Sequence, residues 1–243
     1  MRLTRCFVER PLQTGARLAL PESTANHLAR VLRLREGDAC VLFNGDGHDY
    51  DARITAIGKR EVVAEIASMR AVDHESPLHI TLLQGIARGE KMDLILQKAT
   101  ELGVAAIIPV TAERTEVKLD AERAGKRVAH WRNVIASACE QSARARLPSL
   151  SPPAALADAA RMVDSGATRL TLDPAGDVSM ATVQVASGAV VVAIGPEGGW
   201  SPRDREILSA AGFTGLRLGP RILRTETAGL AAIAALQSRF GDL

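Results

Sequence analysis

The stretch AVVVAIGPEGGWSPRDREILSAAG, residues 189–212, leads from an apolar run through a glycine-rich turn into a polar segment. The continuous run AVVVAI, rich in β-branched residues, is typical of a strand buried on both faces of a sheet. Ser201 is suited to cap a helix, Pro202 suits its first position, and Asp204 completes a capping-box pattern. Gly212 is a stop signal for that helix. A buried strand followed by a capped helix predicts an α/β sheet.

The same alternation extends in both directions from this stretch. Continuous apolar strands interleaved with helices predict a mainly parallel sheet with helices on both faces. The expected strands are LHITLLQ from Leu78, VAAIIPV from Val104, TRLTLDP from Thr168 and GLRLG from Gly215. The expected helices are about Glu90–Leu102, Ala121–Ser142 and Thr225–Arg239.

Residues 1–72 have a different texture, with short β-like runs and tight turns. ACVLF is followed by Asn44-Gly45-Asp46-Gly47, a strong hairpin signal. One helix is expected near Glu22–Leu34, and residues 71–77 read as a linker. We therefore expect a small β-rich domain over residues 1–72 and an α/β domain over residues 73–243.

Composition excludes several classes of protein. The chain has 243 residues, 47% hydrophobic and 24% charged, which is ordinary for a globular protein. It has no apolar run of about 18 residues, so no membrane span is expected. Cys6, Cys40 and Cys139 are scattered without CxxC spacing, which favours a reducing cytoplasm and no metal site.

Charge is unevenly distributed although the net charge is only +2. Residues 1–35 carry seven arginines against two glutamates, whereas residues 36–76 carry four basic and nine acidic residues. A basic face beside an acidic one suits phosphate contact, because only the face that meets the polyanion must be positive. A solvated arginine-rich surface explains the same pattern, and charge alone does not separate the two interpretations.

Three strand ends carry unusual loops: 172–174, 195–199 and 218–228. Ligands of open α/β sheets bind outside the carboxyl ends of the strands. Glycines there permit close backbone approach to a heterocycle and its sugar. GxxxxGK[ST] and GxGxxG are absent, which argues against a P-loop enzyme and an ordinary dinucleotide fold. The three loops together predict a ligand site of another kind.

The motifs GPEGGWSPRDRE and LRLGPRILRTETAGLAAIAAL resemble the SPOUT class of RNA methyltransferases, and more narrowly the RsmE family. GIARGEKMDLILQKATELGVAAIIPV and WRNVIASACEQSARARLP resemble the family's central helices and strand, and RCFV with HLARVLRLREGD resembles its PUA-like RNA-binding domain. The resemblance covers nearly the whole chain. Trp200 stands where the family often has Phe, and Asp173-Pro174 where Glu or His is common.

The resemblance implies an α/β SPOUT fold with a C-terminal trefoil knot behind a PUA-like barrel. It also implies a cytoplasmic homodimer that uses S-adenosylmethionine to methylate N3 of a uridine in 16S ribosomal RNA, free or in the small ribosomal subunit. The implied cofactor-binding residues are Leu172, Asp173, Gly195, Pro196, Glu197, Gly198, Gly199, Leu218, Gly219, Arg221, Ile222, Leu223, Thr225 and Ala228.

Arg224 is the first catalytic candidate, because a fixed positive charge stabilises the anion formed when uracil N3 loses its proton. Glu197 and Glu226 are candidate proton acceptors or contacts to the cofactor amine. The alternatives are an Arg224–Glu226 ion pair that holds the loop to the helix, and a turn-stabilising role for Glu197. The candidate RNA-binding residues are Arg5, Arg30, Arg33, Lys91, Lys98, Arg114, Arg144 and Arg146.

Three other functions remain open from the sequence. One is a ribose 2′-O-methyltransferase of the same fold, which the resemblance of the first domain disfavours. Another is a non-catalytic RNA-binding or assembly protein whose glycine loops are structural. The third is a small-molecule transferase, which the arginine-rich first domain disfavours.

Overall fold

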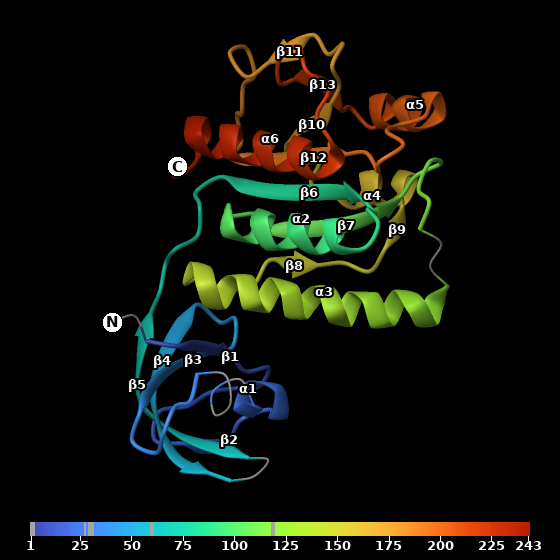
Figure 1. The fold of residues 1–243 in the computed structure, drawn as a ribbon. Helices are drawn as coiled ribbons and strands as arrows, with labels where there is room; N and C mark the ends of the chain where they lie inside the picture. Colours follow the sequence, from blue (N-terminus) through green and yellow to red (C-terminus); the bar gives the residue numbers. More distant parts are fainter. Residues whose placement is uncertain (1–2, 27, 29–31, 59–60, 118–119) are drawn as a thin grey trace. The chain divides into compact units, whose positions relative to one another are not determined.

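The computed structural model describes residues 3–26, 28, 32–58, 61–117 and 120–243. The chain divides into two compact units (Figure 1): the first unit is Met1–Glu75 with Ala136–Leu147, and the second is Ser76–Ile135 with Pro148–Leu243. The predicted division after residue 72 lies close to the first of these boundaries. The sequence did not indicate that residues 136–147 belong with the first unit. Within that unit the Gly47 N–H donates to the Ala145 carbonyl at 3.2 Å.

The first unit is built on a five-stranded sheet of order β1-β3-β4-β5-β2. Its β1 and β3 pair in parallel and the other neighbours are antiparallel. The turn at Asn44–Gly47 joins β3 to β4, as predicted. Alternate strand residues such as Leu42, Ile54 and Ile66 form the core. The elements are β1 (Arg5–Phe7), β2 (Arg17–Ala19), α1 (Glu22–Asn26), β3 (Ala39–Phe43), β4 (His48–Ile57) and β5 (Val62–Ala71).

Of the helix predicted over Glu22–Leu34, the structure shows α1 over Glu22–Asn26, and residues 27 and 29–31 lie outside the described residues. α1 ends at Asn26, and the Leu34 N–H donates to the Leu28 carbonyl at 3.0 Å, a wider loop than an α-helix closes. Arg33 has a φ of 54°, in the left-handed region, which a continuous helix does not contain. Arg33 is therefore not part of a continuous helix. Arg30 lies outside the described residues.

Two predicted RNA contacts are buried in this unit instead. The Arg5 side chain is 5% exposed and pairs with Asp49 at 2.7 Å, and Arg70 contacts the other Asp49 oxygen at 2.7 Å. Arg144 is 4% exposed and forms an ion pair with Glu75. Buried charges must be paired, and pairing inside the unit leaves neither guanidinium available to a phosphate. The prediction of Arg5 and Arg144 as RNA-binding residues is therefore wrong.

We expect Arg5→Ala to destabilise the first unit by about 3 kcal/mol, at the low end for a broken buried pair because Arg70 still neutralises Asp49. The control is Arg17→Ala, which breaks an Arg17–Glu65 pair that is 69% and 43% exposed and is expected to cost about 1 kcal/mol or less. Native-state hydrogen exchange at β3–β5 amides measures both. Equal losses in the two variants would contradict the structural role of Arg5.

The second unit contains an eight-stranded sheet of order β11-β13-β10-β12-β6-β7-β8, with β9 paired to β7. Every described strand pair in it is parallel. Its strands are β6 (His79–Gly85), β7 (Ala106–Thr111), β8 (Ser149–Leu150), β9 (Ala154–Ala155), β10 (Thr168–Leu172), β11 (Val178–Ser179), β12 (Ala189–Ile194) and β13 (Thr214–Arg217). Its helices are α2 (Glu90–Glu101), α3 (Ala121–Ser142, whose last turns belong to the first unit), α4 (Leu156–Met162), α5 (Pro202–Ala210) and α6 (Thr225–Phe240). The predicted parallel α/β fold is confirmed.

Helices α4 and α5 pack together, as do α2 and α6. The first pair covers a core that includes Leu83, Val191 and Leu208. The predicted capping box is present, since the Ser201 hydroxyl accepts from the Asp204 N–H while the Asp204 carboxylate accepts from the Ser201 N–H. None of the helices within the described ranges is long and apolar enough to cross a membrane.

Sheet order decides which loops meet. Strands β13, β10, β12 and β6 are successive neighbours and run parallel, so their carboxyl ends share one edge. The segments that leave these ends begin at Leu218, Asp173, Gly195 and Ile86. The three loops singled out in the sequence are therefore brought together, and the end of β6 joins them.

Candidate active site

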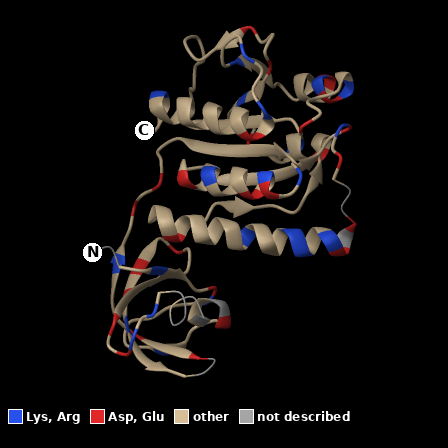
Figure 2. Cartoon of the chain, viewed as in Figure 1, with Lys and Arg blue, Asp and Glu red and all other residues tan. Residues whose placement is uncertain are grey.

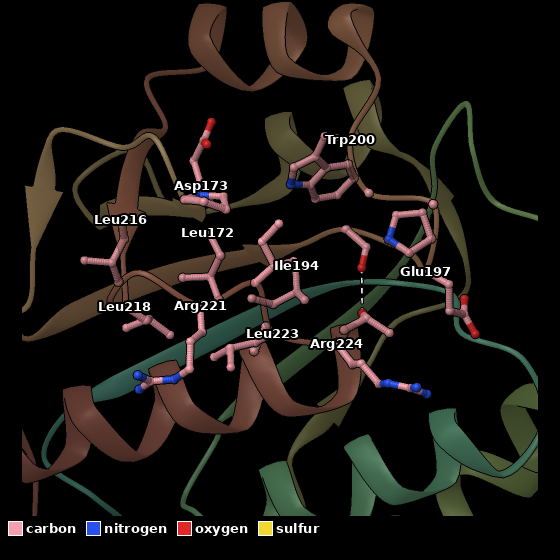
Figure 3. Close-up of a pocket in the computed structure, with 18 of the residues that line it drawn as sticks. Leu172, Asp173, Ile194, Glu197, Trp200, Leu216, Leu218, Arg221, Leu223 and Arg224 are labelled. Carbon is pink, nitrogen blue, oxygen red and sulfur yellow. Dashed lines mark hydrogen bonds between the residues drawn. The ribbon is translucent and has the colours of Figure 1, made fainter.

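The three strand-end loops enclose one cavity of about 370 Å³ (Figure 3). Every residue predicted to bind the cofactor lines it, from Leu172 to Ala228. Leu172, Leu218 and Leu223 lie on its apolar side, and the Gly195–Gly199 turn forms another wall. The sequence did not single out Ile194, Arg205 or Leu216, which also line it. Apolar walls beside exposed backbone groups suit a flat heterocycle with a polar edge.

The Gly195–Gly199 turn is held by contacts from three other segments. The Glu197 carboxylate accepts from the Arg88 N–H at 3.0 Å. The Gly198 carbonyl accepts from Arg114 Nη1 at 3.1 Å, and the Gly195 carbonyl accepts from the Thr225 hydroxyl at 2.6 Å. The loops that follow β6 and β7 and the start of α6 therefore all fix this turn.

Glu197 is held as a carboxylate. Burial raises the pKa of its carboxyl, but hydrogen bonds from the Arg88 and Glu197 backbone N–H groups and the charge of Lys91, 3.5 Å away, outweigh it and lower the pKa. A carboxylate whose pKa is lowered is a poor proton acceptor near neutral pH. The geometry therefore favours the turn-stabilising role of Glu197 over that of a base.

Backbone comes very close to this turn at Gly85, the last residue of β6. A Cβ placed on Gly85 would lie 2.7 Å from Pro196 Cδ and 2.8 Å from the Gly195 carbonyl carbon, so only glycine fits without a shift. No local pattern predicts this contact, because Gly85 and Pro196 become neighbours only through the pairing of β6 with β12.

Arg224 lies at the edge of the cavity, in the position before α6. It is exposed, and in Figure 3 its guanidinium points away from the leucines, toward the side where Glu197 lies. Among the described residues it forms no ion pair, so the alternative of an Arg224–Glu226 pair is not seen. Glu226 is half-buried and is not among the residues that line the cavity, so a role as proton acceptor there has no support.

Asp173 and Trp200, where the sequence departs from the family pattern, both contact protein groups. The Asp173 carboxylate pairs with Arg205 and accepts from the Ala175 N–H at 3.0 Å. The Trp200 indole N–H donates to the Thr171 hydroxyl at 2.9 Å. Both side chains therefore shape the cavity wall, and the Asp173 backbone is itself bonded, its N–H to the Leu216 carbonyl and its carbonyl to the Gly176 N–H.

The remaining basic candidates differ in their surroundings. Lys91 lies beside Glu197, and Arg114 lines the cavity. Lys98 pairs with Glu101 at 2.9 Å on α2 and is 41% exposed. Arg146, in the first unit, is exposed and lies over Gly47, where a Cβ would meet its Nη2 at 2.6 Å. Arg88, which the sequence did not suggest, is 60% exposed and pairs with Glu116 at 2.7 Å.

Comparison with known proteins identifies the family. An RNA methyltransferase domain family matches residues 74–237, and an RNA methyltransferase PUA domain family matches residues 20–67. The ribosomal RNA small subunit methyltransferase E of Buchnera aphidicola is 33% identical, over 100% of this chain and 98% of its own length. This chain belongs to the RsmE family of RNA methyltransferases. The predicted resemblance is confirmed.

Other members agree over the whole length. The Bacillus subtilis ribosomal RNA small subunit methyltransferase E is 29% identical, over 96% of each chain. The crystal structure of the enzyme of that name from Neisseria gonorrhoeae, bound to S-adenosylmethionine, is 42% identical with a TM-score of 0.94 and covers 99% of each chain. The predicted fold, an α/β methyltransferase domain behind a β-rich PUA-like domain, is confirmed by these members.

Proposed function

We propose that this chain transfers a methyl group from S-adenosylmethionine to N3 of a uridine in the 16S ribosomal RNA of the small subunit. The observation that carries the proposal is the cavity at the carboxyl edge of the sheet, with Arg224 at its rim. The names of the family members support an RNA substrate, and the cofactor of the Neisseria structure supports the methyl donor.

The size of the cavity suits a small-molecule cofactor. Its volume of about 370 Å³ lies within the range of roughly 300–1,000 Å³ typical of small-molecule sites. A Cβ on Gly195 would lie 3.3 Å from Gly199 and from Trp200, so the turn is tightly packed at this position. Leu172, Leu218 and Leu223 would hold the adenine face, and the backbone of residues 195–199 its polar edge.

The bound cofactor supplies an electrophilic methyl group on a sulfonium. The protein's part is to orient it and to stabilise charge. In this proposal uracil N3 loses its proton to solvent water, and the Arg224 guanidinium stabilises the anion that forms on N3 and its flanking oxygens. Glu197 holds the turn through the Arg88 N–H and carries no proton in this scheme.

RNA contact uses the basic residues that remain accessible. These are Arg33 and Arg146 in the first unit and Arg88, Lys91, Lys98 and Arg114 in the second. Figure 2 shows Lys and Arg on α2 and along the first half of α3, interspersed with acidic residues. Exposed ion pairs such as Lys98–Glu101 are worth about 1 kcal/mol or less, so a phosphate can replace the carboxylate. Such contacts position the RNA and do not select the base.

We further propose the trefoil knot, the homodimer and the cytoplasmic location that the family resemblance implies. The three C-terminal loops around one cavity are consistent with a knot. Ile222, 86% exposed in the 218–224 loop, is an apolar side chain that a second subunit would cover. Sedimentation of the purified protein at a dimer mass supports the assembly, and a monomer mass contradicts it.

The function is tested by incubating the protein with methyl-labelled S-adenosylmethionine and either small-subunit particles or free 16S RNA, then identifying the labelled nucleoside after digestion. N3-methyluridine is the expected product. A ribose 2′-O-methyl nucleoside would establish the rival chemistry. No transfer to either RNA by protein that binds the cofactor would favour an assembly role, and RNA affinity that stays flat as salt rises would favour a small-molecule substrate.

Glu197→Gln separates a positioning role from a proton-accepting role. Because the amide oxygen still accepts from the Arg88 N–H, we expect cofactor affinity and kcat within about threefold of wild type, with an unchanged pH profile. Glu197→Ala loses that acceptor and is expected to weaken cofactor binding about tenfold. Calorimetry and initial rates measure the two.

The pH dependence of stability follows from the same carboxylate. Its folded pKa is lowered, so its contribution is complete above the unfolded pKa of about 4.3 and is lost as pH falls through the folded value. No change in folding stability from Glu197 is therefore expected near neutral pH.

A kcat loss of about 100-fold in Glu197→Gln with cofactor binding intact would identify Glu197 as the base instead.

A further inference from the structure

A buried glutamine lies at the carboxyl end of β6, behind the Gly195–Gly199 turn, which we call the cofactor turn. Gln84 is 0% exposed and lies opposite Ile194 in the pairing of β6 with β12. Its Nε2 donates to the Gly85 carbonyl at 2.9 Å and to the Thr225 hydroxyl at 3.1 Å. Its Oε1 has no hydrogen-bond partner within the described part of the chain.

The direction of these hydrogen bonds is fixed by chemistry. The Gly85 carbonyl can only accept, so the NH₂ end of Gln84 must face it. One amide hydrogen serves Gly85 and the other serves Thr225. Since the Thr225 hydroxyl accepts from Gln84, its single proton is free to go to the Gly195 carbonyl, 2.6 Å away. These hydrogen bonds therefore form a relay in which Gln84 donates to Thr225 and Thr225 donates to Gly195.

Stability does not explain a glutamine at this position. The unpaired buried acceptor costs stability comparable to what the two Nε2 hydrogen bonds contribute, so an apolar side chain of the same length would be about as stable. Gln237, also 0% exposed, provides the contrast: its Oε1 accepts from the Ser76 hydroxyl at 2.6 Å and its Nε2 donates to the Leu102 carbonyl at 2.9 Å. Gln237 is satisfied at both ends, whereas Gln84 is satisfied only toward the cofactor turn.

Two members of the relay, Thr225 and Gly195, line the cavity. Gly195 begins the turn that lines the cavity, and Thr225 is the first residue of α6, directly after Arg224. A hydroxyl fixed between them sets the spacing of the turn and the start of this helix.

We propose that Gln84 is a positioning residue, which orients the Thr225 hydroxyl onto the Gly195 carbonyl and so fixes the cofactor turn relative to Arg224. This inference rests on the proposed function, because it assumes that the cavity binds S-adenosylmethionine.

The test is a double-mutant cycle with Gln84→Met and Thr225→Val, followed by calorimetry with S-adenosylmethionine, steady-state kinetics and thermal unfolding. Gln84→Met is expected to weaken cofactor binding about tenfold and to lower kcat about tenfold, with an unfolding midpoint close to that of wild type. Because both substitutions break one relay, the double variant is expected to be no worse than the weaker-binding single variant. Thr225→Ser keeps the hydroxyl and is expected to recover most of the affinity that Thr225→Val loses.

The matched control is Gln237→Met, which is expected to lower the unfolding midpoint while cofactor affinity stays unchanged. Wild-type affinity in Gln84→Met, or additive losses in the double variant, would overturn the relay and leave the proposed function intact. A Thr225→Ser variant as weak as Thr225→Val would overturn the relay without use of any Gln84 variant. Wild-type protein that fails to bind S-adenosylmethionine would overturn the relay and the proposed function together.

Discussion

Arg224→Ala is expected to lower kcat by about 100- to 1000-fold while the affinity for S-adenosylmethionine stays within about twofold of wild type. The guanidinium is exposed at the rim of the cavity and forms no ion pair among the described residues, so its removal leaves no buried charge behind. Its backbone carbonyl still accepts from the Thr227 and Ala228 N–H groups, so α6 keeps its start. The loss should therefore fall on the chemical step.

Single-turnover methyl transfer to small-subunit RNA measures this loss, with calorimetry for the cofactor. Arg224→Lys keeps the charge without the planar fork and should recover part of the rate. The control is Arg203→Ala, an exposed arginine of α5 that does not line the cavity and should leave the rate unchanged. If Arg224→Ala raised KM for RNA with kcat unchanged, the residue would be an RNA-binding residue and its catalytic role would be excluded.

Gly85→Ala is expected to weaken S-adenosylmethionine binding by about 10- to 100-fold. The added Cβ would meet the Pro196 ring at 2.7 Å and the Gly195 carbonyl carbon at 2.8 Å, and neither can move aside as a flexible side chain does. Inserting one carbon into a closely packed region costs about 1–3 kcal/mol, and here the strain falls on the cofactor turn. Calorimetry measures the affinity directly.

Gly125→Ala is the matched control for this substitution. A Cβ at Gly125 has no atom within 4 Å and the residue lies within α3, so alanine should stabilise the protein by about 0.5–1 kcal/mol and leave cofactor affinity unchanged. Wild-type affinity for S-adenosylmethionine in Gly85→Ala would show that the Gly195–Gly199 turn tolerates displacement. It would then contradict the role of this turn in cofactor binding.

Local sequence signals predicted most elements of the second unit. Helix α3 was predicted with the observed bounds, and α5 followed from its capping residues. The short elements α4, β8, β9 and β11 were not predicted. LADAARM in α4 has seven residues and no capping side chain, so its helicity depends on packing against α5 and β7. Strand order also had no signal, because spacing along the chain does not say which strands pair.

The parts of the candidate site that depend on the residues of one loop were predictable. The parts that depend on contacts between segments far apart in the sequence were not. Two glycine-bearing strand ends, together with the Leu172-Asp173-Pro174 end, identified the three loops. Gln84 and Gly85 escaped notice because their importance arises from contacts with residues more than 100 positions away. The arginines show the converse: Arg5 and Arg144 look like surface charges in the sequence, yet the fold brings Asp49 and Glu75 to them and buries both guanidinium groups.

The most direct test of the central claim is a crystal structure of this protein with S-adenosylmethionine bound. We expect the adenosine to lie between Leu172, Leu218 and the 195–199 backbone, with the transferable methyl group open toward the side of Arg224. Cofactor bound outside this cavity, or a methyl group enclosed on the side away from Arg224, would contradict it.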